Sequence, residues 1–356
     1  MKILTVIGNR PQFIKAAAVS PRLRDAHEEL LVHTGQHFDD ALSSVFFDEL
    51  GLPAPERELG IGLGSNTSQA ARMLAALEPV LTDAAPDAVL VYGDTNSTLA
   101  GALSGAQAGV PVVHVEAGMR SFDRSMPEEL NRVLTDHASA LLLCSSPAAV
   151  ENLRREAVSG QIELVGDVMV DVALAVQPAA RARLDLVRAR GLAPGQYVLA
   201  TAHRAGNVDD PARLRRLVEL LCAIPMALLV ALHPRTHARL HDSGLLDRLR
   251  GAGHVVLTGP LGYIELTALL TNARAVLTDS GGLQKEAYLA GVQCVTLRSS
   301  TEWVETVQYG WNVLVDLDRA AALGALQRDP PQLRPELYGD GQAGGRVVAA
   351  LTRHWQ

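Results

Sequence analysis

The segment 277–286, Leu-Thr-Asp-Ser-Gly-Gly-Leu-Gln-Lys-Glu, joins an apolar run to a helix-forming stretch through a hydroxyl and two glycines. Glycines let the backbone approach a ligand closely, and the unpaired N–H groups at a helix start attract anions. The segment therefore predicts a phosphate site at Ser280, Gly281 and Gly282. The alternative is an ordinary strand-to-helix turn with Ser280 as its N-cap.

A second kind of chemistry is indicated by Glu116, which directly follows the apolar run 112–115. A carboxylate at the edge of a hydrophobic core is desolvated, which raises its pKa toward that of a working acid or base. A buried ion pair with Arg120 or Arg132 is the alternative. Asp94 also follows an apolar run, where the ordinary role of an aspartate is to cap a helix.

Pro127 and the two glutamates after it are typical of a helix start. Glu128, Arg132 and Asp136 recur every four residues and so share one helix face, which by itself suggests a surface ion ladder. The upstream segment 121–126 shifts this interpretation toward function, because it would place the start of the helix over a ligand cleft.

Arginine, lysine and histidine residues lie beside other predicted strand ends. The formal net charge of −7 argues against a nucleic-acid surface, so an anionic substrate must be met by local positive charge. His203 and His233 each follow an apolar run, and either alone is an ordinary structural hydrogen bonder. Because both are expected on the same rim as Ser280, an anion pocket is the better interpretation. The candidate cations are Arg10, Lys15, Arg120, Arg124, Arg132, His203, Arg204, His233 and Arg235.

The segment 259–263, Gly-Pro-Leu-Gly-Tyr, lies between two apolar runs. Its backbone could wrap a planar base. Gly262 and Tyr263 are therefore candidate binding residues.

These residues must be positioned by strands, and short apolar runs alternate along the chain with segments of helical period. Such alternation is typical of parallel sheets that helices bury on both faces. The runs lie at 3–7, 30–33, 88–92, 110–115, 140–144 and 162–165, and then at 197–200, 227–232, 254–257, 273–278 and 293–297. The segment 171–196 has no strand pattern and suits a helical linker. We predict two doubly wound Rossmann-like α/β domains that face one another across a cleft, with ligands beyond the carboxyl ends of the strands.

Composition excludes several classes of protein. The 356 residues, 48% of them hydrophobic and 20% charged, suffice for two domains with large cores. No window reaches the roughly 18 consecutive apolar residues of a membrane span, and the opening apolar run indicates the first strand of a cytoplasmic protein. Cys144, Cys222 and Cys294 lie in apolar segments without metal-ligand spacing, so we expect buried thiols and no metal site.

Seven motifs occur in the order found in one enzyme family. They are Gly-Asn-Arg-Pro with Lys15, Thr34-Gly35-Gln36-His37, Gly93-Asp94-Thr95, His114-Val115-Glu116-Ala117-Gly118, Pro127-Glu128-Glu129 with Asn131-Arg132, His203-Arg204, and Thr278-Asp279-Ser280-Gly281-Gly282. From about residue 1 to about residue 316, the chain resembles the bacterial non-hydrolysing UDP-N-acetylglucosamine 2-epimerases. An ordered set of motifs is far more specific than a lone glycine-rich loop.

The resemblance implies the glycosyltransferase-B-like fold, a homodimer, a UDP-sugar substrate, and inversion at C2 of the sugar without a redox cofactor. The implied route is an anti elimination of UDP to a 2-acetamidoglucal, followed by re-addition of UDP. The expected domains are 1–170, which carries the catalytic carboxylates, and 171–342, which binds the UDP moiety. A final helix at 343–356 is expected to pack back on the first domain.

The resemblance also implies roles for individual residues. The catalytic candidates are Asp94, Glu116 and Glu128, with Lys15 orienting or neutralising one of them, and His203. The substrate-binding candidates are Arg10, Arg120, Arg132, His233, Arg235, Gly262, Tyr263, Ser280, Gly281, Gly282 and Glu286. Which carboxylate removes the C2 proton and which returns it stays open.

Three departures from the better-known epimerases bear on the substrate. Where those enzymes carry Arg-Pro after Thr-Glu, the segment 301–305 reads Thr-Glu-Trp-Val-Glu. The segment 120–126 is shorter, and 37–40 reads His-Phe-Asp-Asp. These features resemble the branch that epimerises UDP-2,3-diacetamido-2,3-dideoxyglucuronate, whose extra carboxylate Arg120 or Arg124 could meet. A hydrolysing epimerase and a nucleotide-sugar glycosyltransferase are further alternatives.

Some family members bind a second UDP-sugar as an allosteric activator. Here Gln36, His37 and Arg72 could correspond to the residues that hold it. The spacing around Ser68 and Gln69 differs from the family pattern, so this activation is not expected.

Overall fold

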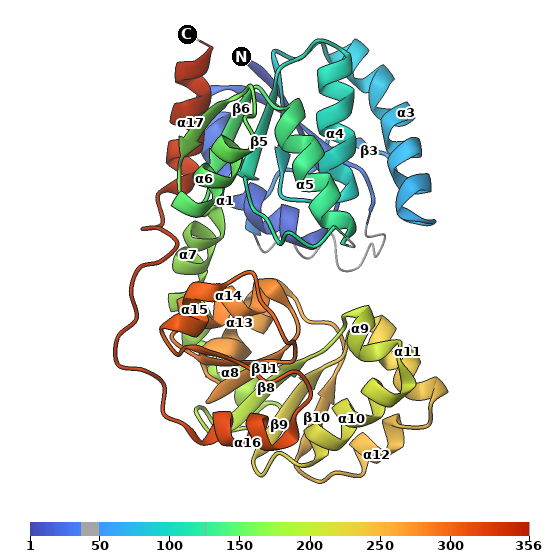
Figure 1. Cartoon of the computed structure of the whole chain (residues 1–356), viewed down its shortest axis with the longest axis vertical. Coiled ribbons are helices and arrows are strands. Elements are labelled where there is room, and N and C mark those ends of the chain that lie inside the picture. Colours follow the sequence, from blue (N-terminus) through green and yellow to red (C-terminus); the bar gives the residue numbers. More distant parts are fainter. Residues whose placement is uncertain (37–49, 125, 356) are drawn as a thin grey trace. The chain divides into compact units, whose positions relative to one another are not determined.

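The computed structural model describes residues 1–36, 50–124 and 126–355, and the chain forms two compact units (Figure 1). The first comprises Met1–Val172 and Tyr338–Gln356, and the second comprises Ala173–Leu337. Helix α7 (Val168–Ala182) contains the division, close to the boundary predicted after residue 170. Each unit has its own sheet and its own core.

In the described part of the first unit, seven parallel strands form one sheet in the order β3-β2-β1-β4-β5-β6-β7. They are β1 (Lys2–Ile7), β2 (Glu28–His33), β3 (Arg57–Glu58), β4 (Ala88–Tyr92), β5 (Val112–Ala117), β6 (Leu141–Cys144) and β7 (Gln161–Leu164). Every residue of β4 is buried, because helices cover both faces of the sheet. The chain order reverses between β1 and β4, and open α/β sheets bind ligands at such switch points.

Six further helices of this unit lie within the described residues. They are α1 (Arg10–Ala26), α3 (Asn66–Ala84), α4 (Asn96–Gln107), α5 (Pro127–Ala138), α6 (Pro147–Arg155) and α17 (Ala343–His354). The Thr95 hydroxyl accepts a hydrogen bond from the Thr98 N–H, and the Thr95 N–H donates to the Thr98 hydroxyl, which fixes where α4 begins. The carboxylate of Asp171 accepts hydrogen bonds from the first backbone N–H groups of α17, so the C-terminal helix is tied to the first unit.

In the second unit, whose residues are all described, six parallel strands take the order β10-β9-β8-β11-β12-β13. The strands are β8 (Tyr197–Thr201), β9 (Ala227–Ala231), β10 (Val255–Thr258), β11 (Ala275–Thr278), β12 (Gln293–Thr296) and β13 (Asn312–Leu314). The helices are α8 (Leu184–Arg188), α9 (Ala205–Val208), α10 (Pro211–Cys222), α11 (Pro234–Asp242), α12 (Leu246–Arg250), α13 (Tyr263–Thr271), α14 (Gly281–Ala290), α15 (Val304–Gln308) and α16 (Arg319–Gln327). The chain order reverses between β8 and β11.

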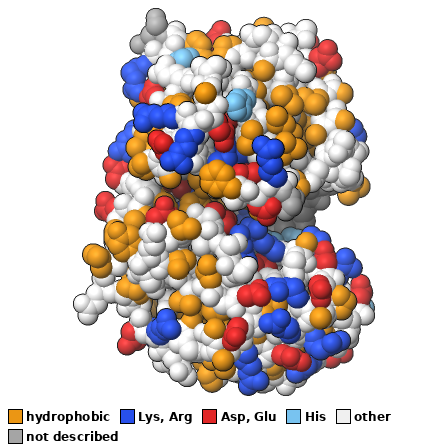
Figure 2. Space-filling view, viewed as in Figure 1, with side chains coloured by type: hydrophobic (Ala, Val, Ile, Leu, Met, Phe, Trp, Pro, Cys, Tyr) orange, Lys and Arg blue, Asp and Glu red, His pale blue; other side chains and the backbone are white. Residues whose placement is uncertain are grey.

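The two sheets confirm the predicted class of two doubly wound parallel α/β domains. Apolar clusters pack on the sheets, and the largest in the second unit joins α10, β8, β9 and α16. On the face of this unit shown in Figure 2, Lys and Arg side chains are intermixed with Asp and Glu. Exposed ion pairs such as Arg248–Glu219, at 3.6 Å, contribute little to stability.

Over the described stretches of the chain, no helix has the length and apolar character needed to cross a membrane. Among those same residues, no three His, Cys, Asp or Glu side chains are arranged to hold a metal ion.

Candidate active site

Lys15 and Glu116 form an ion pair at the switch point of the first unit. Lys15 lies in the second turn of α1 and Glu116 near the end of β5, and their side chains are only 11% and 12% exposed. Burial alone would lower the pKa of Lys15, but the nearby carboxylates of Glu116 and Asp94 raise it above its ordinary value. Lys15 is thus a fixed positive charge beside two candidate proton-transfer groups.

The backbone beside this ion pair has positive φ at two residues, Glu116 and Gly93. Glu116 has φ of 71°, a left-handed conformation that is strained for a residue with a side chain, and the register of β5 with β6 shifts there. Gly93 also has positive φ, and a Cβ added to it would lie 2.7 Å from the Lys15 ammonium nitrogen. A side chain at position 93 would be strained by this φ and would displace the ammonium, so glycine is favoured there.

Asp94 is held from the side by Arg132. One guanidinium nitrogen of Arg132 lies 2.5 Å from the Asp94 carboxylate, and another lies 2.9 Å from Glu129. Burial alone would lower the pKa of Arg132, but Asp94 and Glu129 raise it, so the side chain stays charged. Glu129 in turn accepts hydrogen bonds from the backbone N–H groups of Ser121 and Phe122. The loop after β5 is thereby linked to Asp94 through two side chains.

Glu128, Arg132 and Asp136 do not form the ion ladder that their spacing suggests. Glu128 is exposed near the start of α5, whereas Asp136 is fully buried and contacts His114 and Arg120. The alternative that Glu116 pairs with Arg120 or Arg132 is also wrong, because Glu116 forms its ion pair with Lys15.

Arg120 is occupied by carboxylates inside the first unit. Its side chain is 1% exposed and forms ion pairs with Asp136 at 2.8 Å and Glu156 at 2.6 Å. In this structure the Arg120 guanidinium is thus held by two carboxylates, and its contact with the substrate stays a prediction. Arg124 is exposed, and Arg10 is a half-buried residue at the first position of α1, after the N-cap Asn9.

The residues considered for a second UDP-sugar are partly described. Gln36 accepts hydrogen bonds from the backbone N–H and the hydroxyl of Ser97, and Arg72 donates to the carbonyl oxygens of Leu63 and Ser68. His37 and the segment 38–40 lie outside the described residues. The observed bonds of Gln36 and Arg72 are internal to the first unit.

Ser280, Gly281 and Gly282 lie where β11 passes into α14, at the switch point of the second unit. The Ser280 hydroxyl accepts a hydrogen bond from the Leu283 N–H at 3.4 Å, so the predicted N-cap is present. This cap still leaves the helix dipole and the other early N–H groups of α14 suited to an anion, because a capping hydroxyl satisfies only one of them. Glu286 is half-buried in the second turn of the helix.

Glu302 and Trp303 pack against the start of α14. The Trp303 indole N–H donates to the Gly281 carbonyl oxygen at 2.8 Å, and the Lys285 ammonium lies 4.5 Å from the centre of the Trp303 rings. Glu302 pairs with Arg298 at 2.9 Å and lies 3.8 Å from Arg204. Burial alone would raise the pKa of Glu302, but these cations lower it. The segment that departs from the better-known epimerases therefore borders the predicted phosphate helix.

Asp279 fixes the loop after β8. Its carboxylate has no exposed surface and accepts hydrogen bonds from the backbone N–H groups of His203 and Arg204 and from the Asn207 amide. The His203 ring is stacked on that of His233, with 5.5 Å between ring centres. The two histidines predicted to share the rim of Ser280 are thus in contact with each other.

The remaining candidates of the second unit have mainly local roles in the described structure. The His233 ring accepts a hydrogen bond from the Arg235 N–H at the start of α11, while the Arg235 guanidinium pairs with Asp209. Gly262 is the N-cap residue of α13, and Tyr263 is 1% exposed directly after it. The backbone of 259–263 thus stays a candidate for a planar base, whereas the Tyr263 ring belongs to the core.

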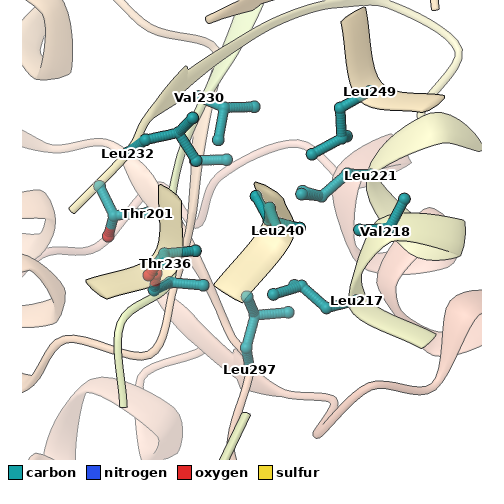
Figure 3. A pocket seen from close by; sticks show the side chains of 12 residues that line it. Thr201, Leu217, Val218, Leu221, Val230, Leu232, Thr236, Leu240, Leu249 and Leu297 are labelled. Atoms are coloured by element: carbon teal, nitrogen blue, oxygen red, sulfur yellow. The ribbon is translucent and has the colours of Figure 1, made fainter. Parts of the chain in front are cut away.

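The second unit also contains a small apolar cavity and a larger groove. One apolar cavity of about 10 Å³ is lined largely by leucine side chains, among them Leu217, Leu221 and Leu240 (Figure 3). It has about the volume of one water but few polar partners for it, so it is a gap in the packing. A groove of about 600 Å³ borders Thr258, Gly259 and Pro260, at the end of β10 where the candidate base-binding segment begins.

Sequence reasoning missed several residues that shape the site. Glu129, His114 and Asp279 are all buried polar groups that hold candidate residues or their loops. All three belong to motifs that the sequence analysis names. The sequence does not show which residues of a motif have buried side chains.

Comparison with known proteins agrees with this geometry. Residues 22–352 match the family model described as UDP-N-acetylglucosamine 2-epimerase. A Pseudomonas aeruginosa UDP-2,3-diacetamido-2,3-dideoxy-D-glucuronate 2-epimerase is 45% identical over 99% of this chain and 100% of its own length. A Methanococcus maripaludis UDP-N-acetylglucosamine 2-epimerase homolog is 43% identical over 99% of each chain.

A crystal structure of the Methanocaldococcus jannaschii UDP-GlcNAc 2-epimerase in complex with UDP-GlcNAc and UDP superposes with a TM-score of 0.92. The two sequences are 39% identical, and the match covers 99% of this chain and 100% of the other. Family model, relatives and fold therefore agree over nearly the whole chain, which belongs to the UDP-N-acetylglucosamine 2-epimerase family.

Proposed function

We propose that this protein is a non-hydrolysing 2-epimerase that interconverts UDP-N-acetylglucosamine and UDP-N-acetylmannosamine. The observation that carries the proposal is the Lys15–Glu116 pair beside Asp94, at the switch point of the first unit. Full-length relatives named as UDP-N-acetylglucosamine 2-epimerases support the same activity.

The chemistry explains why both carboxylates and an anion site are needed. The C2 hydrogen of a hexosamine has no adjacent carbonyl to acidify it, so departure of UDP must assist its removal. In the elimination, a base takes the C2 proton, the C–H electron pair forms the C1–C2 double bond, and the C1–O bond breaks with its electron pair on UDP. Re-addition returns a proton to the opposite face of C2 and rebinds UDP at C1. Overall no atom is oxidised or reduced, so the proposed cycle needs no redox cofactor.

We assign proton transfer to the first unit, with Asp94, Glu116 and Glu128 as the acids and bases and Lys15 as the charge beside them. UDP contacts are assigned chiefly to the second unit. The proposed contacts are Ser280, Gly281, Gly282, His203, Glu286 and the backbone at Gly262, and Arg10 joins them by family resemblance. Hydrogen-bond donors aimed at the departing diphosphate stabilise the charge that develops on it.

An alternative substrate is UDP-2,3-diacetamido-2,3-dideoxyglucuronate. Two observations favour it. A relative with that activity is 45% identical along its whole length, and Trp303, the first of the two residues that stand in place of the usual Arg-Pro, borders the phosphate helix. A homodimer in the cytoplasm is proposed from family resemblance alone. Light scattering of the purified protein measures the oligomeric state.

The test of the reaction is proton NMR of the protein with UDP-N-acetylglucosamine in D₂O. Deuterium at C2 of an intact UDP-sugar, together with the manno epimer, is the expected result. Release of UDP and free sugar would instead establish a hydrolysing enzyme. Absence of exchange with this substrate and exchange with the diacetamido-uronate would establish the alternative.

The catalytic assignment is tested with Asp94→Asn, Glu116→Gln and Glu128→Gln. Loss of a general acid or base is expected to lower kcat by roughly 10²–10⁴-fold. Glu151→Gln is a matched control, because Glu151 forms an exposed ion pair with Arg155 at the surface. A variant that turns over like this control would lose its assigned role.

A further inference from the structure

His114 lies on β5, two residues before Glu116, and has no exposed surface. One ring nitrogen, Nε2, lies 2.7 Å from the Gly93 carbonyl oxygen, and the other, Nδ1, lies 2.7 Å from the Asp136 carboxylate. Gly93 directly precedes Asp94. The proposed reaction does not itself use this buried imidazole.

Asp136 links His114 to the backbone that follows Glu116. Its second oxygen accepts a hydrogen bond from the Gly118 N–H at 3.1 Å and lies 2.8 Å from Arg120. Gly118 follows Glu116 by two residues. A single buried chain of contacts therefore joins the backbone before Asp94 to the backbone after Glu116.

The partners of His114 determine where its protons lie. A carbonyl oxygen can only accept a hydrogen bond, and so can an ionised carboxylate. The Gly118 N–H and the Arg120 guanidinium face the second oxygen of Asp136, and both contacts favour the ionised carboxylate. Both imidazole nitrogens must therefore donate, and His114 is an imidazolium.

The charges around His114 are consistent with that state. The charged groups of the cluster are His114, Arg120, Asp136 and Glu156, and a positive His114 makes their sum zero. Cys144 on β6 lies near Asp136, but burial raises the pKa of its thiol to about 12, so it adds no charge. His137, on α5, is 3.9 Å from Glu156 at the exposed edge of the cluster. The Glu156 side chain is 27% exposed and its charge is partly solvated, so the protonated state of His114 rests on its two acceptor contacts.

We propose that His114 is a positioning residue of the epimerase, which holds the backbones on either side of Asp94 and Glu116 as a charged bridge from the Gly93 carbonyl oxygen to Asp136. The inference rests on the proposed function for its effect on turnover. Its protonation state does not depend on that function.

The first experiment is nitrogen-15 NMR of the wild-type protein with labelled histidine. His114→Gln identifies the His114 signals. Both ring nitrogens of His114 are expected to show imidazolium shifts at pH 7, where an ordinary exposed histidine is largely neutral. A neutral tautomer of His114 at pH 7 would overturn the proposal.

The second experiment compares turnover of His114→Gln and His114→Asn with wild type. Each amide can restore one of the two hydrogen bonds, but neither carries the charge. Misplacing the catalytic groups is expected to lower kcat by about 10²-fold, with the UDP dissociation constant unchanged. His254→Gln is the matched control, because that ring contacts a backbone carbonyl in the second unit at 3.4 Å.

The outcomes separate the two proposals. If folded His114 variants keep wild-type kcat, His114 is only a structural ion-pair partner and the inference fails. If the wild-type protein epimerises neither UDP-sugar while His114 is an imidazolium, the proposed function fails and the buried bridge stands. Should both variants fail to fold, the His114 signals are assigned through the backbone resonances of the wild-type protein, and the measurement still decides whether the bridge is charged.

Discussion

Arg132 contacts Asp94 at 2.5 Å, and it reaches this carboxylate from α5, thirty-eight residues further along the chain. The neighbouring Asn131 amide donates to the Asp94 backbone carbonyl at 3.0 Å. Two adjacent residues of one helix thus hold both the backbone and the side chain of a proposed catalytic group. Asp94 is therefore oriented by α5 as well as by its own loop.

Replacing Arg132 is expected to release Asp94 and lower kcat. Arg132→Lys keeps the charge but cannot contact Asp94 and Glu129 at once, so a loss of about 10–10²-fold in kcat is expected. Arg155→Lys changes an exposed pair and serves as the control. Steady-state kinetics measure both. A wild-type kcat in Arg132→Lys would show that the Asp94 side chain does not need this guanidinium.

The stability that the loop 121–122 gains from Glu129 depends on pH. Burial alone would raise its pKa, but hydrogen bonds from Ser121, Arg132 and Phe122 lower it below the ordinary value. Because the folded-state pKa is lowered, the stability that ionised Glu129 contributes is present above about pH 4.3 and is lost as the pH falls further. Glu129→Gln presents an amide N–H to these donors and is expected to cost about 2 kcal/mol at pH 7.

Urea unfolding of wild type and Glu129→Gln at about pH 7, 5.5 and 3.5 checks this sign. The difference in unfolding free energy should be equal at the two higher pH values and smaller at the lowest. Glu151→Gln, at an exposed pair, should cost no more than about 0.5 kcal/mol. A difference that already shrinks between pH 7 and 5.5 would contradict the lowered pKa.

The three cysteines are expected to differ in reactivity. Burial raises the pKa of Cys144 and of Cys294 to about 12, whereas Cys222 is only partly buried. The thiolate is the reactive form, so a thiol reagent at pH 8 should label Cys222 first and the other two only after unfolding. Mass spectrometry of the labelled protein identifies the sites. Rapid labelling of Cys144 in the folded protein would show that the first-unit core opens.

The strands and the rim of each sheet could be predicted because buried parallel strands are continuous apolar runs. The strands β3 and β13 were not predicted. They contain two and three residues at sheet edges, and Arg57 and Glu58 in β3 are polar. A strand that short has no pattern of its own and forms only because a neighbour offers hydrogen bonds.

The candidate residues could be located, but their partners could not. Lys15 and Glu116 are 101 positions apart in the chain, so only the fold brings them together. Spacing also favoured Glu128 over Glu129 for a shared face with Arg132. Adjacent helical residues point about 100° apart, and the position of the loop 121–122 decides which of the two glutamates is buried.

Gly281 provides a test of the second-unit site. A Cβ at this position would collide with the Glu302 carboxylate, which Arg298 and Arg204 hold in place. Gly281→Ala must therefore shift Glu302 or the start of α14. Overpacking costs about 1–3 kcal/mol, which would weaken UDP binding roughly 10–100-fold if the strain falls on the bound state.

Titration calorimetry with UDP measures the effect. Gly324→Ala in α16 is the matched control, because no atom lies within 4 Å of its added Cβ. That variant should bind UDP like wild type and be more stable by about 0.5–1 kcal/mol, since alanine favours a helix interior over glycine. If Gly281→Ala binds UDP as tightly as Gly324→Ala, the start of α14 does not bind the diphosphate, and Lys15, Glu116 and Asp94 would need another partner for the departing anion.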